Sequence, residues 1–221
     1  MKKNKNLKKL LTATFVFLLL SVLVAVPGLS ADPVVKVTLL HLNDVYEIDP
    51  VSGGAQGGLA RVATLKKQLL KENQNTYAIL AGDFFSPSAL GTAPYKDGCL
   101  DGRQMVATMN QLGLDYIAFG NHEFDLSKDS FYARLSESRS TWISSNVFDE
   151  KGNPFPGVSE SEIITVTDDS NNKVRIGFFG VTLASNKKPY VTYKDPLENA
   201  RAMVKKLRGK VDILIAITHL A

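Results

Sequence analysis

Four residues with metal-binding side chains stand directly after apolar, strand-like stretches of the sequence. Asp44, Asp83 and Asn121 each follow such a stretch, and His219 closes the last one. In open parallel sheets, ligands bind in the crevice outside the carboxyl ends of the strands. Each residue alone has an ordinary structural explanation, as a turn former, a helix cap or a core histidine. The repeated placement at strand ends favours a shared site.

These four side chains offer the chemistry of a divalent transition-metal site. Carboxylate, amide and imidazole donors suit Mn, Fe, Co, Ni or Zn, and Asp83 could bridge two ions. Two neighbouring metals activate a water and hold phosphate oxygens during in-line displacement at phosphorus. We therefore expect two divalent ions, with Asp44, Asp83, Asn121 and His219 as ligands.

A general acid for that displacement is predicted beside the metal ligands. His122 directly follows Asn121 and could protonate a leaving alkoxide, with Asp125 three residues on to orient its ring. On its own, His122 would as readily be a surface residue. Gly82 and Gly120 precede two of the ligands, where glycine would allow sharp backbone turns under the metal centre.

The elements that must position these residues alternate between apolar, β-branched runs and amphipathic stretches. This alternation is typical of an α/β protein with a largely parallel sheet. It predicts strands over residues 34–42, 77–81, 116–119, 141–145, 174–181 and 211–218. Helices are predicted over 59–71, 102–112, 128–138 and 196–208, the last with Asp195 as N-cap and Gly209 as the stop. A loop or hairpin is expected over 148–172.

Residues 1–31 are predicted to be an export signal peptide rather than part of the fold. Lysines precede an almost wholly apolar run over 10–26, and small residues at 29–31 offer a cleavage site. The alternative is an uncleaved membrane anchor, because the run approaches the length of a membrane span. In both cases residues 32–221 are expected outside the cytoplasm, as a secreted, periplasmic or cell-surface domain.

The charge distribution gives no sign of a nucleic-acid partner. The chain has a formal charge of +4, but residues 1–31 carry five lysines and no acidic residue, so the remainder has a charge of −1. Its densest basic clusters are the pairs Lys66-Lys67 and Lys205-Lys206. Membrane contact is expected only through an uncleaved anchor. The single cysteine, Cys99, cannot form an intramolecular disulfide, so an apolar core must stabilise the fold.

An ordered series of short motifs runs from the first predicted strand to the last. The most specific is Gly120-Asn121-His122-Glu123, with Asp125 close behind. The others are Leu39 to Asp44, Gly57 to Arg61, Gly82-Asp83, Leu112-Gly113, Ser145-Asn146-Val147, Ile176 to Thr182 and Thr218-His219. The series resembles the calcineurin-like metallophosphoesterase domain of bacterial 5'-nucleotidases, and the resemblance covers essentially all of residues 34–221.

The resemblance implies an α/β/β/α sandwich of two packed sheets. It implies that Asp83 bridges the metals, that Asn121 and His219 bind the second metal, and that His122 with Asp125 is the general acid. It also implies hydrolysis of a nucleoside phosphate to a nucleoside and phosphate. The expected partner is therefore a small-molecule phosphoester, with nucleotides foremost.

Two features depart from the family pattern. Tyr46 stands where the family usually has a histidine after Asp44, although the Asn-Asp-x-Tyr form resembles a subgroup. A phenol with a pKa of about 10 is a poor ligand unless a metal deprotonates it, so Tyr46 is interpreted as either a weak ligand or packing at the site rim. The family's later Gly-His-x-His segment has no counterpart among His41, His122 and His219. His41 is a candidate substitute ligand.

From this second departure we expect residues 32–221 to be a partial domain whose sandwich is incomplete at the C-terminus. Little or no activity is expected of the chain by itself. The alternatives to a hydrolase are a truncated, non-catalytic fragment and a secreted module that binds phosphate or a nucleotide without cleaving it.

Overall fold

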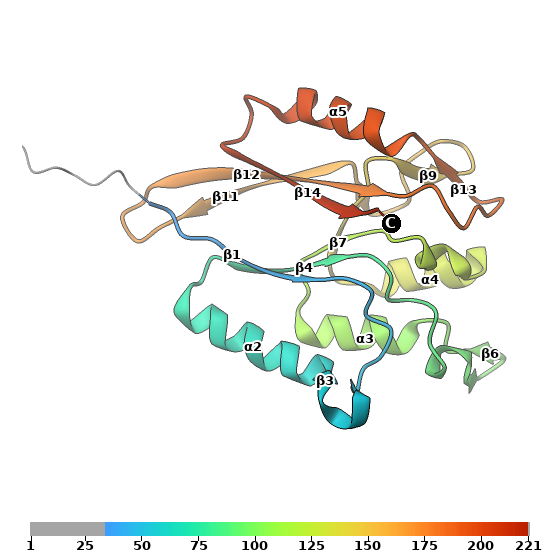
Figure 1. The fold of residues 1–221 in the computed structure, drawn as a ribbon. Helices are drawn as coiled ribbons and strands as arrows, with labels where there is room; N and C mark the ends of the chain where they lie inside the picture. The colour runs from blue at the N-terminus through green and yellow to red at the C-terminus, as the bar shows by residue number, and fades with distance from the viewer. Residues whose placement is uncertain (1–33, 221) are drawn as a thin grey trace, which may run out of the picture. The chain divides into compact units, whose positions relative to one another are not determined.

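In the computed structural model, which describes residues 34–220, two β-sheets pack face to face between helices (Figure 1). This arrangement confirms the α/β/β/α sandwich that the sequence predicts. The predicted signal peptide or anchor over residues 1–31 lies outside the described residues. Within 34–220, no helix has the length and apolar character needed to cross a membrane.

The first sheet has five strands, all parallel. Their spatial order is β1 (Thr38–Leu42), β4 (Thr76–Ala81), β7 (Tyr116–Ala118), β8 (Thr141–Ile143) and β10 (Val158–Ser159). The first four were predicted. Strands β1, β7 and β8 are shorter at one end than predicted, whereas β4 begins one residue earlier; residues 34–37 in particular precede β1 rather than belong to it. Because β1, β4 and β7 are parallel neighbours, their carboxyl ends meet at one edge.

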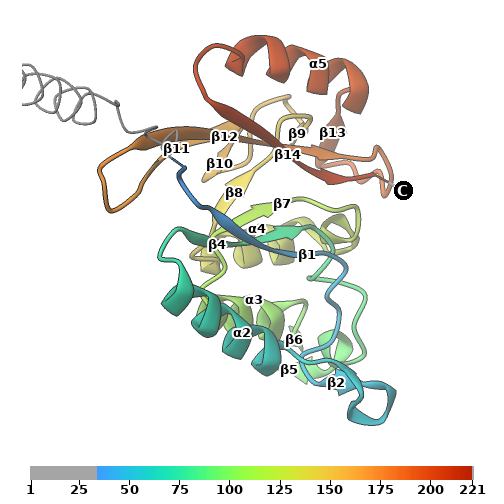
Figure 2. The same cartoon turned by 60° about the vertical axis from the view of Figure 1, so that its left-hand side comes forward.

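Three helices cover the outer face of the first sheet (Figure 2). They are α2 (Leu59–Glu72), α3 (Arg103–Leu112) and α4 (Lys128–Glu137), close to the predicted ranges. The core between them and the sheet is rich in aromatic rings, including Phe119, Phe124, Phe131 and Trp142, all nearly inaccessible to solvent. Burying each such side chain contributes about 1.5–3 kcal/mol, so the loops after β4 and β7 rest on a rigid base.

The second sheet has the order β11 (Ser161–Thr167), β12 (Lys173–Thr182) and β14 (Ile213–His219). Strands β11 and β12 form an antiparallel hairpin, whereas β12 and β14 are parallel. The predicted loop or hairpin over 148–172 is therefore a hairpin in its second half, and the sheets are not one largely parallel sheet. Tyr116 of the first sheet stacks on Phe178 of the second, with ring centroids 4.9 Å apart, in the core between the sheets.

Helix α5 (Pro196–Leu207) covers the outer face of the second sheet (Figures 1 and 2). The Asp195 side chain accepts a hydrogen bond from the backbone N–H of Glu198, and Pro196 occupies the first turn. Gly209 follows with a left-handed φ of +83°. These features confirm the predicted start and stop signals of this helix.

Short elements fill the connections between the main strands. They are β2 (Pro50–Val51), η1 (Ser52–Gly54), β3 (Gln56–Gly57), η2 (Leu90–Thr92), β5 (Pro94–Tyr95), β6 (Gly98–Cys99), η3 (His122–Asp125), β9 (Val147–Asp149) and β13 (Val191–Tyr193). Strands β9 and β13 pair with each other, as do β2 with β3 and β5 with β6.

Candidate metal centre

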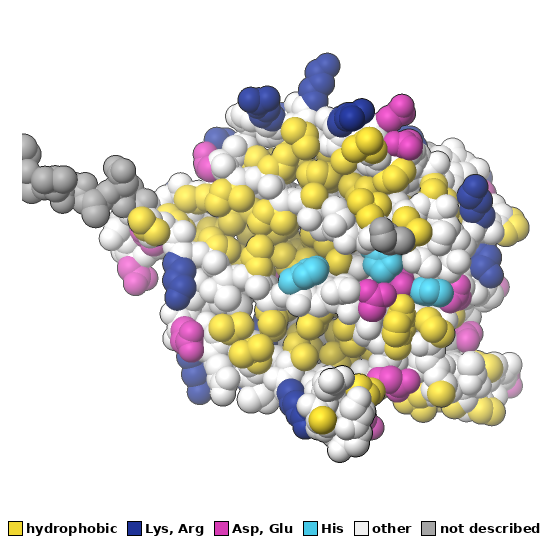
Figure 3. Space-filling view, in the orientation of Figure 1, with side chains coloured by type: hydrophobic (Ala, Val, Ile, Leu, Met, Phe, Trp, Pro, Cys, Tyr) yellow, Lys and Arg dark blue, Asp and Glu magenta, His cyan; other side chains and the backbone are white. Residues whose placement is uncertain are grey.

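The four predicted metal ligands meet at one edge of the sandwich. Asp44, Asp83 and Asn121 follow β1, β4 and β7 of the first sheet, and His219 ends β14 of the second. Ligand atoms of Asp44, Asp83 and His219 all lie within 4.8 Å of one another. Figure 3 shows histidine and acidic side chains gathered on this face. The shared placement at strand ends therefore brings these side chains together.

These side chains line a cleft of about 550 Å³, together with Tyr46 and His122. His41, the candidate substitute ligand, also lines the cleft from the exposed edge strand β1. Among the described residues, however, the group of converging acidic and imidazole ligand atoms does not include His41.

His219 links the two sheets and aims one ring nitrogen at the other ligands. Its Nδ1 lies 2.7 Å from the Ala81 carbonyl oxygen, while Nε2 lies 3.1 Å from Asn121 Oδ1 and 3.3 Å from Asp83 Oδ2. With Nδ1–H donating to Ala81, Nε2 is the nitrogen available to a metal, an orientation common among metal-binding histidines. The hydrogen bond with Asp83 raises the pKa of His219 to about 9, although burial opposes this.

Asp83 is the central carboxylate of the site and is 1% exposed. Burial alone would raise the pKa of Asp83, but hydrogen bonds with His219 and with the His122 backbone N–H outweigh it and lower the pKa. The His122 N–H donates to Oδ1 over 2.8 Å, whereas Oδ2 faces both His219 and the Tyr46 hydroxyl. A buried, ionised carboxylate between two groups of donors is suited to bridging cations.

Tyr46 lies between two carboxylates of the site. Its hydroxyl is 2.9 Å from Asp83 Oδ2 and 3.0 Å from Asp44 Oδ1. Burial, followed by the two carboxylates, raises the pKa of Tyr46 far above its usual value. The phenol therefore stays neutral and acts as a hydrogen-bond donor in the metal-free chain.

His122 and Asp125 form a hydrogen-bonded pair within η3. His122 Nδ1 lies 2.7 Å from Asp125 Oδ2, as the three-residue spacing predicts. Burial lowers the pKa of His122, but the bond and charge of Asp125 outweigh it and raise the pKa above the usual value. This arrangement favours a protonated imidazole, which is the form that a general acid requires.

The backbone that carries the two aspartates is strained. Asp44 has φ +53° and Asp83 has φ +62°, in the left-handed region that non-glycine residues seldom adopt. Gly82 also has a positive φ, of +77°, as expected of a sharp turn. Gly120 does not have a positive φ. The Asp83 side chain packs closely against it, and a Cβ there would overlap that side chain. Glycine is therefore needed at position 120 for close packing against Asp83 rather than for a left-handed backbone.

Glu123 holds the two central loops together, a role that the sequence analysis missed. It is fully buried, and Oε2 accepts from the backbone N–H groups of Gly120 at 2.6 Å and Asp83 at 2.9 Å. Oε1 accepts from Phe84 at 2.8 Å and Phe85 at 3.3 Å. Burial, followed by the Asp83 charge, raises the pKa of Glu123 above its usual value, although the N–H groups of Phe84, Asp83 and Gly120 oppose this. One signal in the sequence could have indicated this role: Glu123 is the residue of the Gly120-Asn121-His122-Glu123 motif to which no function was assigned.

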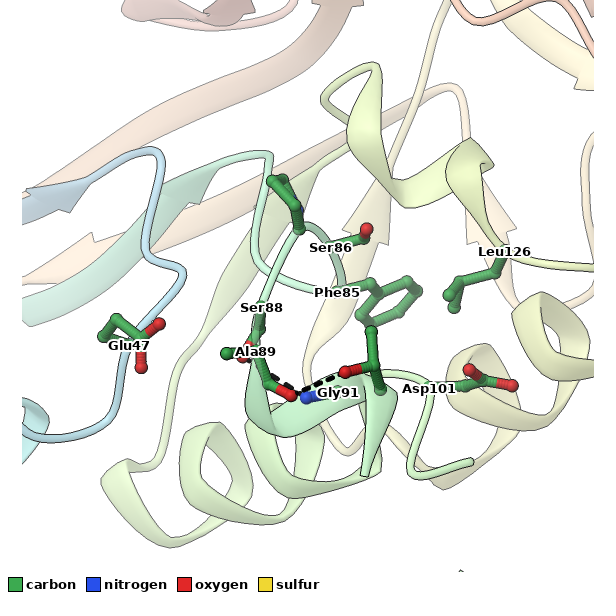
Figure 4. A pocket seen from close by; sticks show the side chains of 10 residues that line it. Glu47, Phe85, Ser86, Ser88, Ala89, Gly91, Asp101 and Leu126 are labelled. Atoms are coloured by element: carbon green, nitrogen blue, oxygen red, sulfur yellow. Dashed lines mark hydrogen bonds between the residues drawn. The ribbon is translucent and has the colours of Figure 1, made fainter. Parts of the chain in front are cut away.

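A second pocket, of about 370 Å³, lies beside the His122 and Asp125 pair, next to Ser86 and Leu126 (Figure 4). Ser86 and Phe85, which follow β4, line it together with Leu126, which follows η3. The Ser86 hydroxyl also donates to Asp125 Oδ2 over 3.1 Å. No motif pointed to Ser86, because it meets the His122 and Asp125 pair only through the tertiary fold.

A family model described as calcineurin-like phosphoesterase matches residues 37–221. The chain belongs to this family. It is 29% identical over 203 residues to a snake venom 5'-nucleotidase of Gloydius brevicauda, covering 83% of this chain and 33% of that protein. It is 25% identical over 203 residues to a 5'-nucleotidase of Vibrio vulnificus, covering 86% of this chain and 35% of that protein. The chain thus spans about a third of the length of these relatives.

Solved structures of calcineurin-like phosphoesterases have the same fold. The 5'-nucleotidase precursor from Thermus thermophilus matches with a TM-score of 0.69 and 29% identity, over 83% of this chain and 37% of that one. The calcineurin-like phosphoesterase from Bacillus subtilis matches with a TM-score of 0.65 and 22% identity, over 86% of this chain and 63% of that one.

Divalent metals are typical of this family, and the donor set described above fits them. Oxygen atoms of Asp83 and Asn121 converge on Nε2 of His219, and a ligand atom of Asp44 lies within 4.8 Å of ligand atoms of Asp83 and His219. Such mixed oxygen and nitrogen donors suit first-row transition metals.

Proposed function

We propose that this chain carries the metal centre and the general acid of a phosphoester hydrolase of the 5'-nucleotidase type. The observation that carries the proposal is the convergence of four ligand-type side chains beside a hydrogen-bonded histidine and aspartate. Membership of the calcineurin-like phosphoesterase family supports hydrolysis as the reaction class. The 5'-nucleotidases among its relatives support a nucleoside monophosphate as the substrate.

Two divalent ions, among Mn, Fe, Co, Ni and Zn, would be held by residues of both sheets. Asp83 would bridge them, with Asp44 on the first ion and Asn121 and His219 on the second. When bound, the ions would activate a water and offset the charge of the phosphate oxygens. Tyr46 would donate its hydrogen bond to the carboxylates or, once deprotonated, serve as a weak ligand.

His122 would supply the proton that the leaving alkoxide needs. Asp125 accepts from Nδ1 and so leaves Nε2 to face the substrate, and its negative charge stabilises the imidazolium form. A well-placed general acid contributes about 10²–10⁴-fold to the rate. After the proton has left, His122 would recover one from solvent.

The proposed location is outside the cytoplasm. The basic and apolar pattern of residues 1–31 supports export, by a cleaved signal peptide or with an uncleaved anchor. Residues 32–221 would then form the domain that carries the site. An extracytoplasmic site would meet nucleotides released from cells or supplied by the environment.

The proposal is tested by phosphate release from a nucleoside monophosphate and from an aryl phosphate. The protein that contains this chain would be assayed after chelation and after addition of Mn²⁺, Co²⁺ or Zn²⁺. Activity should appear only with metal, and Asn121→Ala or His122→Ala should remove most of it. Gln68→Ala, which removes an exposed amide from α2, is the matched control and should change nothing.

Two results would count against the proposal. One is unchanged turnover in both site variants. The other is calorimetric binding of the nucleotide without phosphate release over hours, which would indicate a binding module instead of a hydrolase.

A further inference from the structure

The carboxylate of Asp125 is held by donors from three separate segments of the chain. His122 and Ser86 approach Oδ2, from η3 and from the segment after β4. Oδ1 accepts from Asn186 Nδ2 over 2.7 Å, and Asn186 lies in the connection between β12 and β13. The connection that follows β12 therefore contributes directly to the orientation of the His122 and Asp125 pair, called the acid pair below.

Asn186 uses both hydrogens of its amide at this point. One donates to Asp125 Oδ1, and the other donates to the backbone carbonyl of Asn121 over 3.0 Å. The 3.5 Å approach to His122 Nδ1 is therefore a contact rather than a third bond. Because both partners are acceptors, the nitrogen rather than the oxygen of the amide must face them, which fixes the side chain's orientation.

The backbone around Asn186 is fixed in a conformation that few residues tolerate. Its φ of +48° is in the left-handed region, which asparagine adopts more readily than most residues. The connection is tied at both ends: the Leu183 N–H donates to the His219 carbonyl, and the Tyr190 hydroxyl donates to the Leu126 carbonyl. Asn186 is thus presented to the acid pair by a loop that is itself anchored.

We propose that Asn186 is a positioning residue for the acid pair, and this inference rests on the proposed function of His122. By holding Oδ1, Asn186 prevents the Asp125 carboxylate from rotating and keeps Oδ2 in line with His122 Nδ1. By holding the Asn121 carbonyl, it fixes the distance between the acid pair and a metal ligand. The residue acts through Asp125 and does not contact the substrate.

The experiment compares two Asn186 variants on substrates with different leaving groups. Asn186→Gly keeps the left-handed backbone without strain and removes the amide. Asn186→Asp keeps the size of the side chain but removes both donor hydrogens. Its carboxylate oxygens would then face the Asn121 carbonyl and Asp125 Oδ1, which are also acceptors. Lys187→Ala, at the exposed neighbouring position, is the control. Each protein would be assayed on a nucleoside monophosphate, whose alkoxide needs a proton, and on a dinitrophenyl phosphate, whose phenolate does not.

Both Asn186 variants should lose about tenfold or more in kcat on the nucleotide and less than about threefold on the dinitrophenyl ester, because only the nucleotide depends on the general acid. His122→Ala should show the same selectivity with a larger loss. Three results would overturn the inference: equal losses on both esters, no loss on either, or a tenfold fall in metal affinity, which would give Asn186 a role in holding the ligands.

A second readout is independent of turnover. The hydrogen-bonded Nδ1–H proton of His122 should give a slowly exchanging NMR signal in the chain and in Lys187→Ala, and this signal should broaden or vanish in Asn186→Gly. If no ester is hydrolysed at all, the proposed function fails, while this signal still decides the inference. A sharp, unshifted signal in Asn186→Gly would show that the amide does not position the pair.

Discussion

The candidate metal centre has two halves that are held in different ways. The buried half consists of Asp83, Asn121 and His219, where the His219 ring lies 3.1 Å from the Asn121 side chain and 3.3 Å from the Asp83 side chain. The open half consists of Asp44 and Tyr46, where Asp44 is exposed and its oxygens contact only neighbouring polar side chains. We infer that the side chains of the buried half are already in place for a cation, whereas the side chains of the open half become fixed only when a cation binds.

The physical reason is the number of constraints on each half. Asp83 is fixed by backbone donors, by His219 and by the Glu123 network below it. Asp44 is linked to that network mainly through its backbone N–H, which donates to the Gly82 carbonyl over 3.2 Å. A preorganised site loses little conformational entropy on binding, so the first equivalent of metal should enter the buried half.

The largest expected effect comes from removing the support beneath the buried half. Glu123→Ala leaves four buried backbone N–H groups without a partner, at a cost of about 1–3 kcal/mol for each group that finds no water. We expect a loss of several kcal/mol in the free energy of unfolding, together with loss of tight metal binding. Urea unfolding and calorimetry measure the two quantities. Glu72→Ala, at the exposed end of α2, is the control, and equal behaviour of the two variants would refute this role.

The next effect separates the two halves directly. His219→Ala should weaken binding of the first metal equivalent by about a hundredfold or more, since losing even an outer partner of a ligand typically costs 10–100-fold. Asp44→Ala should weaken mainly the second equivalent and leave the first within about threefold. Calorimetric titration of the chain with Mn²⁺ measures the affinities for the first and second equivalents separately. If both substitutions lower the affinity for the first metal equivalent to the same extent, the two halves do not bind metal separately.

The buried half should also depend on pH in a way that the open half does not. His219 must lose a proton before Nε2 can bind a metal, and Asp83 raises the pKa of His219 to about 9. Below that value each unit of pH increases the deprotonated fraction about tenfold, so first-site affinity should rise about tenfold per unit from pH 7 to 9 and then level off. Metal titrations across this range measure the slope. A flat profile would mean that His219 is not a ligand.

The same interaction has the opposite consequence for the metal-free chain. The folded-state pKa of His219 lies above the unfolded value of about 6.5, so its contribution to stability is fully present below pH 6.5. That contribution is lost as the pH rises through 9. Urea unfolding in the presence of a chelator should therefore give a decreasing free energy of unfolding over this range, and His219→Ala should remove the decrease.

A smaller effect is expected at the open half. Tyr46→His replaces a neutral phenol with a good metal ligand and should strengthen the second equivalent by about tenfold, the range over which a well-placed partner changes affinity. Tyr46→Phe removes only the hydrogen bonds to Asp44 and Asp83 and serves as the comparison. Calorimetry with Zn²⁺ distinguishes the variants. If Tyr46→His binds the second equivalent more weakly, the phenol itself is the ligand.

The smallest effect should come from His41. It lines the cleft but stands outside the converging ligand atoms, so His41→Ala should change metal affinity less than about twofold. If His41→Ala lowered the affinity for Mn²⁺ by tenfold or more, His41 would be a ligand and would belong to the open half.

The sequence predicted those features that depend on local pattern. The cap and stop of α5 and the carboxyl ends of β1, β4 and β7 follow from local residue types and from the parallel arrangement. Those strand ends bring Asp44, Asp83 and Asn121 together, and His219 joins them from the end of β14 in the second sheet. The His122 and Asp125 pair was predictable for the same reason, because three residues of spacing within one turn let the side chains meet.

The features that the sequence analysis missed depend on tertiary packing. The sequence analysis left a loop and a hairpin as alternatives before β12, and only the pairing of β11 with β12 in the second sheet decides for the hairpin. Asn186 reaches the acid pair from an irregular connection, so its contacts have no periodic signal. Tyr46 contacts the carboxylate of Asp83, 37 residues away in the sequence, and residue types alone did not indicate that contact.

The central claim is that Asp83, Asn121 and His219 form a preorganised site, which is occupied before the site at Asp44 when metal is added. The most direct test is a crystal structure of the chain with one equivalent of Mn²⁺, with anomalous diffraction to locate the ion. A single strong peak should lie within coordination distance, about 2.0–2.2 Å, of Asp83 Oδ2, Asn121 Oδ1 and His219 Nε2. A strong peak bound only by Asp44 and Tyr46, or no peak in the cleft, would contradict the account.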